Sequence, residues 1–248
     1  HLDLPCDPLR WYQDALDHHR LDEIPVDGRI AMAATKLPRI HEDPCGRRII
    51  ATAKLLGPGG SPAWSPTGDR LVYHRWDGNG VHQLWTMSPD GTNDRCLTCG
   101  PQAGAPPAER HKVNPNYHPS GRYVILQVEM DNHPVAWMNR VGVVSELIVN
   151  GVWTNLYLTT PDGSRWYRLT DYSATQTDGA MAPWFSPDGT RLLWSRIVAP
   201  ASTENPWGIY KLMIADFVET DGVPSLANIR DITPAGKTLV VEGLRVAG

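Results

Sequence analysis

Five side chains in the middle of the sequence could bind a metal ion or transfer protons. Glu129, Asp131 and His133 fall within five residues of one another, and His111 and His118 precede them. Carboxylate and imidazole groups suit a divalent metal ion, and the same groups can act as a general acid and base pair. A loop with ordinary hydrogen bonds explains the same residues without any ligand. A divalent metal ion is the one cofactor that the sequence suggests.

Two arginines and a histidine form a second group of candidate ligand-binding residues. Arg75 and Arg196 occupy equivalent strand ends in two copies of a repeated segment, and His74 adjoins the first of them. Guanidinium groups bind carboxylates and phosphates through paired hydrogen bonds. Ion pairs with neighbouring acidic residues would satisfy the same arginines equally well.

The repeated segment that positions these residues is clearest between Pro62 and Thr98. Apolar residues alternate there, and Pro, Gly and Asp occupy the turns, so we predict a four-stranded antiparallel meander. The alternation places Leu71, Tyr73 and Leu84 on one face of the sheet and Val72 on the other.

The segment occurs three times. Its first turn, PAWSPTG, matches PNYHPSG at 115–121 and PWFSPDG at 183–189. The second strands then read RLVYHRW, YVILQVE and RLLWSRI, and each fourth strand ends in Leu-Thr or Ile-Thr. Strand quartets in a fixed order, with a period of roughly 40 to 50 residues plus loop insertions, are typical of propeller blades.

These motifs resemble the TolB-like propeller repeat, a WD40-like blade with the pattern P-x-W-S-P-D-G followed by an aromatic strand, D-G and L-T. The resemblance implies an all-β propeller with blades at about 60–99, 113–171 and 181–233. Propellers of this type include periplasmic binding proteins, gating domains of peptidases and oligogalacturonate lyases, so the fold alone does not specify an activity. The lyases use a His-rich metal site, which is why the histidines of the second repeat are of interest.

The ends of the chain differ from the three repeats. Residues 1–25 are expected to form a helical extension, because an Asp-Pro pair precedes apolar residues at helical spacing. Residues 26–56 and 236–246 are expected to contribute strands of a partial blade within a propeller domain spanning 26–248. Three blades cannot close a circle, so these strands complete a fourth blade, or a missing segment or a second chain completes the propeller.

Four cysteines favour disulfides, because their number is even and the fold that the repeat implies is typical of exported proteins. Cys96 and Cys99 have C-x-x-C spacing at a strand end, where free thiols, metal binding or redox catalysis are the alternatives to a disulfide. Cys6 and Cys45 would form a second pair. We therefore expect a periplasmic or secreted location.

Several functional classes are disfavoured by the sequence. A net charge of −4 without a basic stripe argues against nucleic acid as a partner. No apolar run approaches the roughly 18 residues of a membrane span. The chain contains no G-x-S-x-G, no H-E-x-x-H and no phosphate-binding loop.

The resulting expectation is an exported β-propeller that binds a protein, peptide or glycan. Two alternatives stay open. The first is a metal-assisted carbohydrate lyase or hydrolase that uses the His, Glu and Asp side chains of the second repeat. The second is a structural subunit of a larger assembly.

Overall fold

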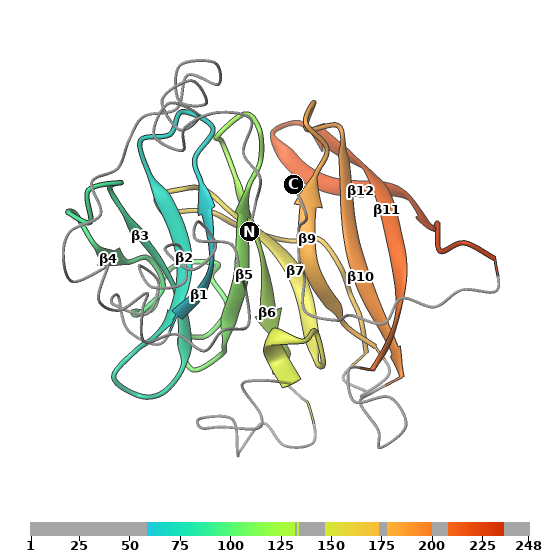
Figure 1. Ribbon diagram of the computed structural model, residues 1–248, viewed down its shortest axis with the longest axis horizontal. Helices are drawn as coiled ribbons and strands as arrows, with labels where there is room; N and C mark the ends of the chain where they lie inside the picture. Colours follow the sequence, from blue (N-terminus) through green and yellow to red (C-terminus); the bar gives the residue numbers. More distant parts are fainter. Residues whose placement is uncertain (1–58, 132, 134–146, 174–177, 200–207, 236–248) are drawn as a thin grey trace, which may run out of the picture. The chain divides into compact units, whose positions relative to one another are not determined.

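The computed structural model of this 248-residue protein describes residues 59–131, 133, 147–173, 178–199 and 208–235 (Figure 1). The chain divides into two compact units between Leu55 and Leu56, and all described residues belong to the second unit. The helix expected in residues 1–25 and the strands expected at 26–56 and 236–246 lie outside the described residues. No helix in the described ranges is long and apolar enough to cross a membrane.

The described part of the chain forms three antiparallel sheets of four strands each, which we call blades 1 to 3. Blade 1 contains β1 (Gly59–Trp64), β2 (Leu71–Trp76), β3 (His82–Met87) and β4 (Arg95–Cys96). Blade 2 contains β5 (Lys112–Tyr117), β6 (Val124–Glu129), β7 (Thr154–Thr159) and β8 (Trp166–Arg168). Blade 3 contains β9 (Ala180–Phe185), β10 (Arg191–Ala199), β11 (Ile209–Thr220) and β12 (Val223–Asp231). Each sheet follows the order of the sequence, as predicted.

The first turn of every blade has the same backbone hydrogen bonds. In blade 1 the amide of Gly68 donates to the carbonyl of Ser65 at 2.9 Å, and the amide of Ser65 donates to the carbonyl of Arg70 at 2.8 Å. Gly68 has φ +73°, a left-handed conformation that glycine adopts without steric cost. The turns that end in Gly121 and Gly189 repeat this arrangement, which explains the shared Pro-x-Gly motif.

The threonine that ends each repeat also has one shared role. Its hydroxyl accepts a hydrogen bond from the amide of a leucine in the third strand. The donor to acceptor distances are 2.8 to 2.9 Å, from Leu84 to Thr98, Leu156 to Thr170 and Leu212 to Thr233. The side chain therefore replaces a ladder bond where the fourth strand has ended.

Apolar layers pack neighbouring blades together. One cluster joins Val72 and Leu84 of blade 1 to Val124 and Leu126 of blade 2. Leu84 therefore shares a face with Val72, and its predicted position beside Leu71 was wrong. The register of the β2–β3 hairpin decides this, because Leu84 lies opposite His74, two residues from Val72. A second cluster, which includes Ile125, Leu156, Leu192, Trp194 and Met213, joins blades 2 and 3.

A bulge in each first strand joins the blades by hydrogen bonds. Ser61, Asn114 and Ala182 each precede a proline and have φ between +49° and +50°, and the strand register shifts around each of them. The amide of Asn114 donates to Nδ1 of His74 in blade 1 at 3.2 Å. The amide of Ala182 donates to Oε1 of Gln127 in blade 2 at 2.9 Å. His74 and Gln127 occupy equivalent positions, so one contact recurs at both blade junctions.

Candidate functional site

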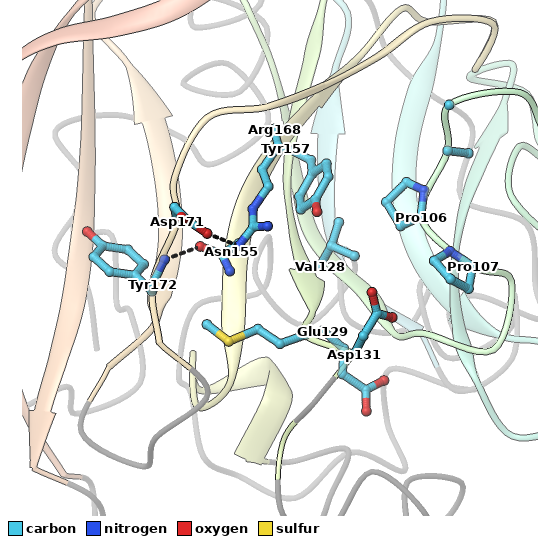
Figure 2. A pocket seen from close by; sticks show the side chains of 13 residues that line it. Pro106, Pro107, Val128, Glu129, Asp131, Asn155, Tyr157, Arg168, Asp171 and Tyr172 are labelled. Carbon is cyan, nitrogen blue, oxygen red and sulfur yellow. Dashed lines mark hydrogen bonds and ion pairs between the residues drawn. The ribbon is translucent and has the colours of Figure 1, made fainter.

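A cavity of about 450 Å³ lies beside blade 2, where β6 ends and β7 begins (Figure 2). The loop between blades 1 and 2 forms one wall with Pro106 and Pro107. The opposite wall comes from β8 and the segment that follows it. The labelled lining residues are Pro106, Pro107, Val128, Glu129, Asp131, Asn155, Tyr157, Arg168, Asp171 and Tyr172.

Asn155 in β7 lies at the base of this cavity and is 2% exposed. Its Oδ1 accepts two hydrogen bonds, from the hydroxyl of Thr170 at 2.9 Å and from the amide of Tyr172 at 2.7 Å. A backbone amide can only donate, so the accepting atom must be the oxygen. The amide nitrogen Nδ2 consequently faces the other way, into the cavity (Figure 2).

Tyr157 and Arg168 complete the polar side of the cavity. Burial raises the pKa of the Tyr157 phenol, which keeps the hydroxyl protonated at neutral pH. The guanidinium of Arg168 donates to the carbonyl of Thr170 at 2.8 Å and pairs with Asp171. Both side chains line the cavity together with Asn155 (Figure 2).

The wall of prolines is fixed from behind by buried side chains of blades 1 and 2. Lys112, 1% exposed, donates from Nζ to the carbonyls of Pro107 and Arg110, each at 2.8 Å. Burial lowers the pKa of this amine to about 8. Gln83 donates to the carbonyl of Ala108 at 2.6 Å. The loop is therefore held by hydrogen bonds on the side away from the cavity.

Glu129 organises the acidic side of the cavity. Its carboxylate accepts the amide of His111 at 2.9 Å and pairs with Nε2 of His133 at 2.6 Å. The His133 ring stacks on Trp153 with centroids 4.7 Å apart. Asp131, in contrast, pairs with Arg110 at 2.9 Å and has an exposed side chain. Glu129 and His133 are thus buried structural partners, while Asp131 reaches solvent.

The structure does not gather the five candidate metal ligands. His111 lies with His74 and His82, with ring centroids 5.3 Å apart for His82 and His111 and 4.9 Å for His74 and His82. Nδ1 of His111 accepts the amide of His82 at 3.0 Å. Among the residues that the structure describes, no three His, Cys, Asp or Glu side chains are grouped so as to hold a metal ion.

His118 lies at the junction of blades 2 and 3, away from the cavity. Its Nε2 is 3.1 Å from the carbonyl oxygen of Gly189, and its ring centroid is 4.5 Å from that of Phe185 and 5.1 Å from that of Phe217. Burial lowers the pKa of this imidazole. His118 replaces the serine of the other two turns and packs one blade against the next.

The two candidate arginines lie in separate blades and each pairs with an acid. Nη1 of Arg75 is 2.8 Å from Asp94, and its guanidinium lies 3.5 Å from the ring centroid of Trp85. Nε of Arg196 is 2.9 Å from Asp178. Neither residue lines the cavity of Figure 2.

Cys96 and Cys99 form a disulfide at the end of β4, with their Cα atoms 5.7 Å apart. Of the alternatives that the C-x-x-C spacing raised, the structure shows the disulfide. Cys6 and Cys45 lie outside the described residues.

Of the residues singled out in the sequence, the cavity brings together Glu129 and Asp131. The sequence reasoning missed Asn155, Tyr157, Arg168 and Lys112. A signal for Asn155 was present, because Gln83, Asn155 and Lys211 stand at one repeat position, directly before the apolar residue whose amide binds the threonine. Because the residue type at this position differs among the three blades, it could have been recognised as a position that does not serve the shared fold.

Comparison with known proteins agrees with the repeat. No protein-family model matches the chain. The Tol-Pal system protein TolB of Gluconobacter oxydans (strain 621H) is 51% identical over 41 residues, which are 16% of this chain and 9% of that protein.

The structural neighbours are TolB and related propeller proteins. A putative TolB from Agrobacterium tumefaciens has a TM-score of 0.45 and 19% identity, over 70% of this chain and 48% of the other. TolB from Acinetobacter baumannii has a TM-score of 0.38 and 17% identity, over 67% and 31%. The chain thus spans less than half the length of these relatives. The 41-residue match to TolB and the three four-stranded antiparallel sheets confirm the predicted resemblance to the TolB-like β-propeller repeat.

Proposed function

We propose that this protein is an exported β-propeller binding module that contacts a protein, peptide or glycan through the cavity beside blade 2. The observation that carries this proposal is the convergence of Asn155, Tyr157 and Arg168 on one cavity of about 450 Å³. Binding sites are typically concave and pre-formed, with a few polar groups at fixed positions. The hydrogen bonds of Lys112 and Gln83 behind the proline wall meet that requirement.

Export is supported by the disulfide between Cys96 and Cys99, since disulfides persist in oxidising compartments. The metal-assisted lyase or hydrolase has no comparable support, because among the described residues no three of its candidate side chains are grouped so as to hold a metal ion.

The test is to block the cavity. Ala105 lines it, so Ala105→Trp would place an indole ring in the space that a partner would occupy. Arrays of immobilised oligosaccharides and of synthetic peptides are probed with the wild type, with this variant and with Asp90→Trp. Asp90 lies in an exposed turn of blade 1 and gives a matched control. We expect wild type and Asp90→Trp to bind the same array members, and Ala105→Trp to lose at least tenfold in signal. Unchanged binding by a folded Ala105→Trp protein would contradict the proposal.

A further inference from the structure

The three blades use one side-chain position in three different ways. Gln83 of blade 1 directs its amide nitrogen to the carbonyl of Ala108, at 2.6 Å. Lys211 of blade 3 pairs with Asp231 at 2.7 Å. Asn155 of blade 2 is one carbon shorter than glutamine, and its Nδ2 has no hydrogen-bond partner among the described residues. Blade 2 thus has a donor that faces the cavity, where the other two blades have a donor that is bonded within the protein.

The orientation of this donor is fixed. Oδ1 of Asn155 is held by the hydroxyl of Thr170 and the amide of Tyr172, so rotating the amide by 180° would place two donors against Nδ2. Because Nδ2 points into the cavity without a partner among the described residues, a ligand atom that accepts a hydrogen bond there meets a donor whose direction is already set.

The surroundings of Nδ2 define the kind of ligand. The Tyr157 hydroxyl and the Arg168 guanidinium line the same cavity and can donate, and the carboxylates of Asp131 and Asp171 can accept (Figure 2). A ligand group that both accepts and donates, such as an alcohol, suits such a mixture. Proline and tyrosine side chains supply apolar surface for its C–H faces.

The charges of the lining disfavour an anionic ligand. Glu129, Asp131 and Asp171 contribute three carboxylates, of which Asp131 pairs with Arg110 and Glu129 with His133. Arg168, the cation among the lining residues, already pairs with Asp171. A carboxylate or a phosphate of a ligand would be repelled by these like charges. A neutral molecule with many hydroxyl groups avoids this repulsion.

We propose that the cavity beside blade 2 binds a neutral saccharide, one hydroxyl group of which accepts a hydrogen bond from Nδ2 of Asn155. This inference rests on the proposed function and names the partner class for the same cavity. A cavity of about 450 Å³ is of a size usual for small-ligand sites, so one or two sugar units would be in direct contact.

The side-chain amide of Asn155 provides a local measurement. In the ¹⁵N-labelled full chain, cellobiose, maltose and N,N′-diacetylchitobiose are added separately, together with any neutral oligosaccharide that binds on the array. We expect at least one of them to shift the Asn155 side-chain NH₂ resonance in a saturable way. The Gln83 side-chain NH₂ resonance is the internal control, because its nitrogen is already bonded to Ala108, and it should stay in place.

Two variants test the hydrogen bond itself. Asn155→Asp keeps an oxygen for Thr170 and Tyr172 but replaces the donor by an acceptor, so the dissociation constant for the saccharide should rise about tenfold to a hundredfold. Tyr157→Phe removes one hydroxyl and should raise it several-fold. Thermal unfolding of both variants checks that the fold is kept. An Asn155→Asp protein with wild-type melting and wild-type affinity would overturn the inference.

The outcomes separate the two proposals. If array peptides or acidic sugars, and no neutral saccharide, shift the Asn155 resonance, the saccharide assignment is wrong and the binding module stands. If Ala105→Trp leaves every array interaction unchanged, the cavity is not the contact site and both proposals fail.

Discussion

His74 shows how a single buried imidazole makes stability depend on pH. Burial, reinforced by repulsion from His111, lowers its pKa to about 4, and its Nδ1 must stay unprotonated to accept the amide of Asn114. In the unfolded chain the pKa returns to about 6.5, so the unfolded state takes up a proton first as the pH falls. The stabilising effect of the neutral ring is therefore complete above pH 6.5 and is lost progressively between pH 6.5 and 4.

His74→Gln should remove this part of the pH dependence. At the equivalent position of blade 2, Gln127 accepts the inter-blade amide of Ala182, so a glutamine side chain can make this type of contact. Between pH 7.5 and 5.0 we expect the free energy of unfolding to fall about 2 kcal/mol further in the wild type than in the variant. His118, whose pKa burial also lowers, lies at the other blade junction and contributes equally to both proteins. Urea unfolding at the two pH values measures the difference, and equal decreases in both proteins would contradict it.

At the residue scale the sequence predicted the interesting region better than the interesting residues. Glu129 and His133 stood out because carboxylate and imidazole groups suit metal ions, yet in the fold Nε2 of His133 pairs with the carboxylate of Glu129. Spacing along a chain cannot show that a hydrogen bond closes between two such groups. Asn155 belongs to no catalytic or ligand-binding motif. Its Nδ2 faces the cavity because Thr170 and Tyr172 both donate hydrogen bonds to its Oδ1, which spacing along the chain does not reveal.

At the element scale, the first strand of each blade carries a strained residue. Ala182 has φ +50°, which costs an L-amino acid about 1 to 2 kcal/mol relative to glycine, although glycine loses more entropy on folding. We expect Ala182→Gly to raise the free energy of unfolding by roughly 0.5 to 1 kcal/mol. Ala180, fully buried in the same strand and not among the residues with positive φ, is the matched control. Ala180→Gly should lower stability by about 1 kcal/mol, as measured by urea unfolding, and stabilisation by both substitutions would refute the strain argument.

The strands themselves were readable from the sequence because alternation and turn residues agree in three copies. Strand pairs and turns fell where the Pro-x-Gly and Leu-Thr motifs placed them. The hairpin register was not readable, and Leu84 was assigned to the wrong face for that reason. The bulges were missed as well, because Ser61, Asn114 and Ala182 share no side-chain chemistry and only the following proline marks them.

At the scale of the whole molecule, the disulfide of blade 1 links the fold to a compartment. If the protein is exported, Cys96 and Cys99 should be protected from iodoacetamide when the protein is isolated under acid-quenched, non-reducing conditions. Reduction before alkylation should add two carbamidomethyl groups to the peptide that contains both residues. Peptide mass spectrometry makes the measurement, and quantitative alkylation without reductant would argue for a reducing location.

The hydrogen bonds between blades have a further consequence for how the molecule opens. The amides of Asn114 and Ala182 donate to the preceding blade, whereas ladder amides donate within one sheet. Exchange of these two protons with deuterated solvent therefore reports separation of neighbouring blades, even while each blade keeps its own ladder. The exchange rates of these two amides would give the free energy of separation at each blade junction. The difference between them would show which junction opens more easily.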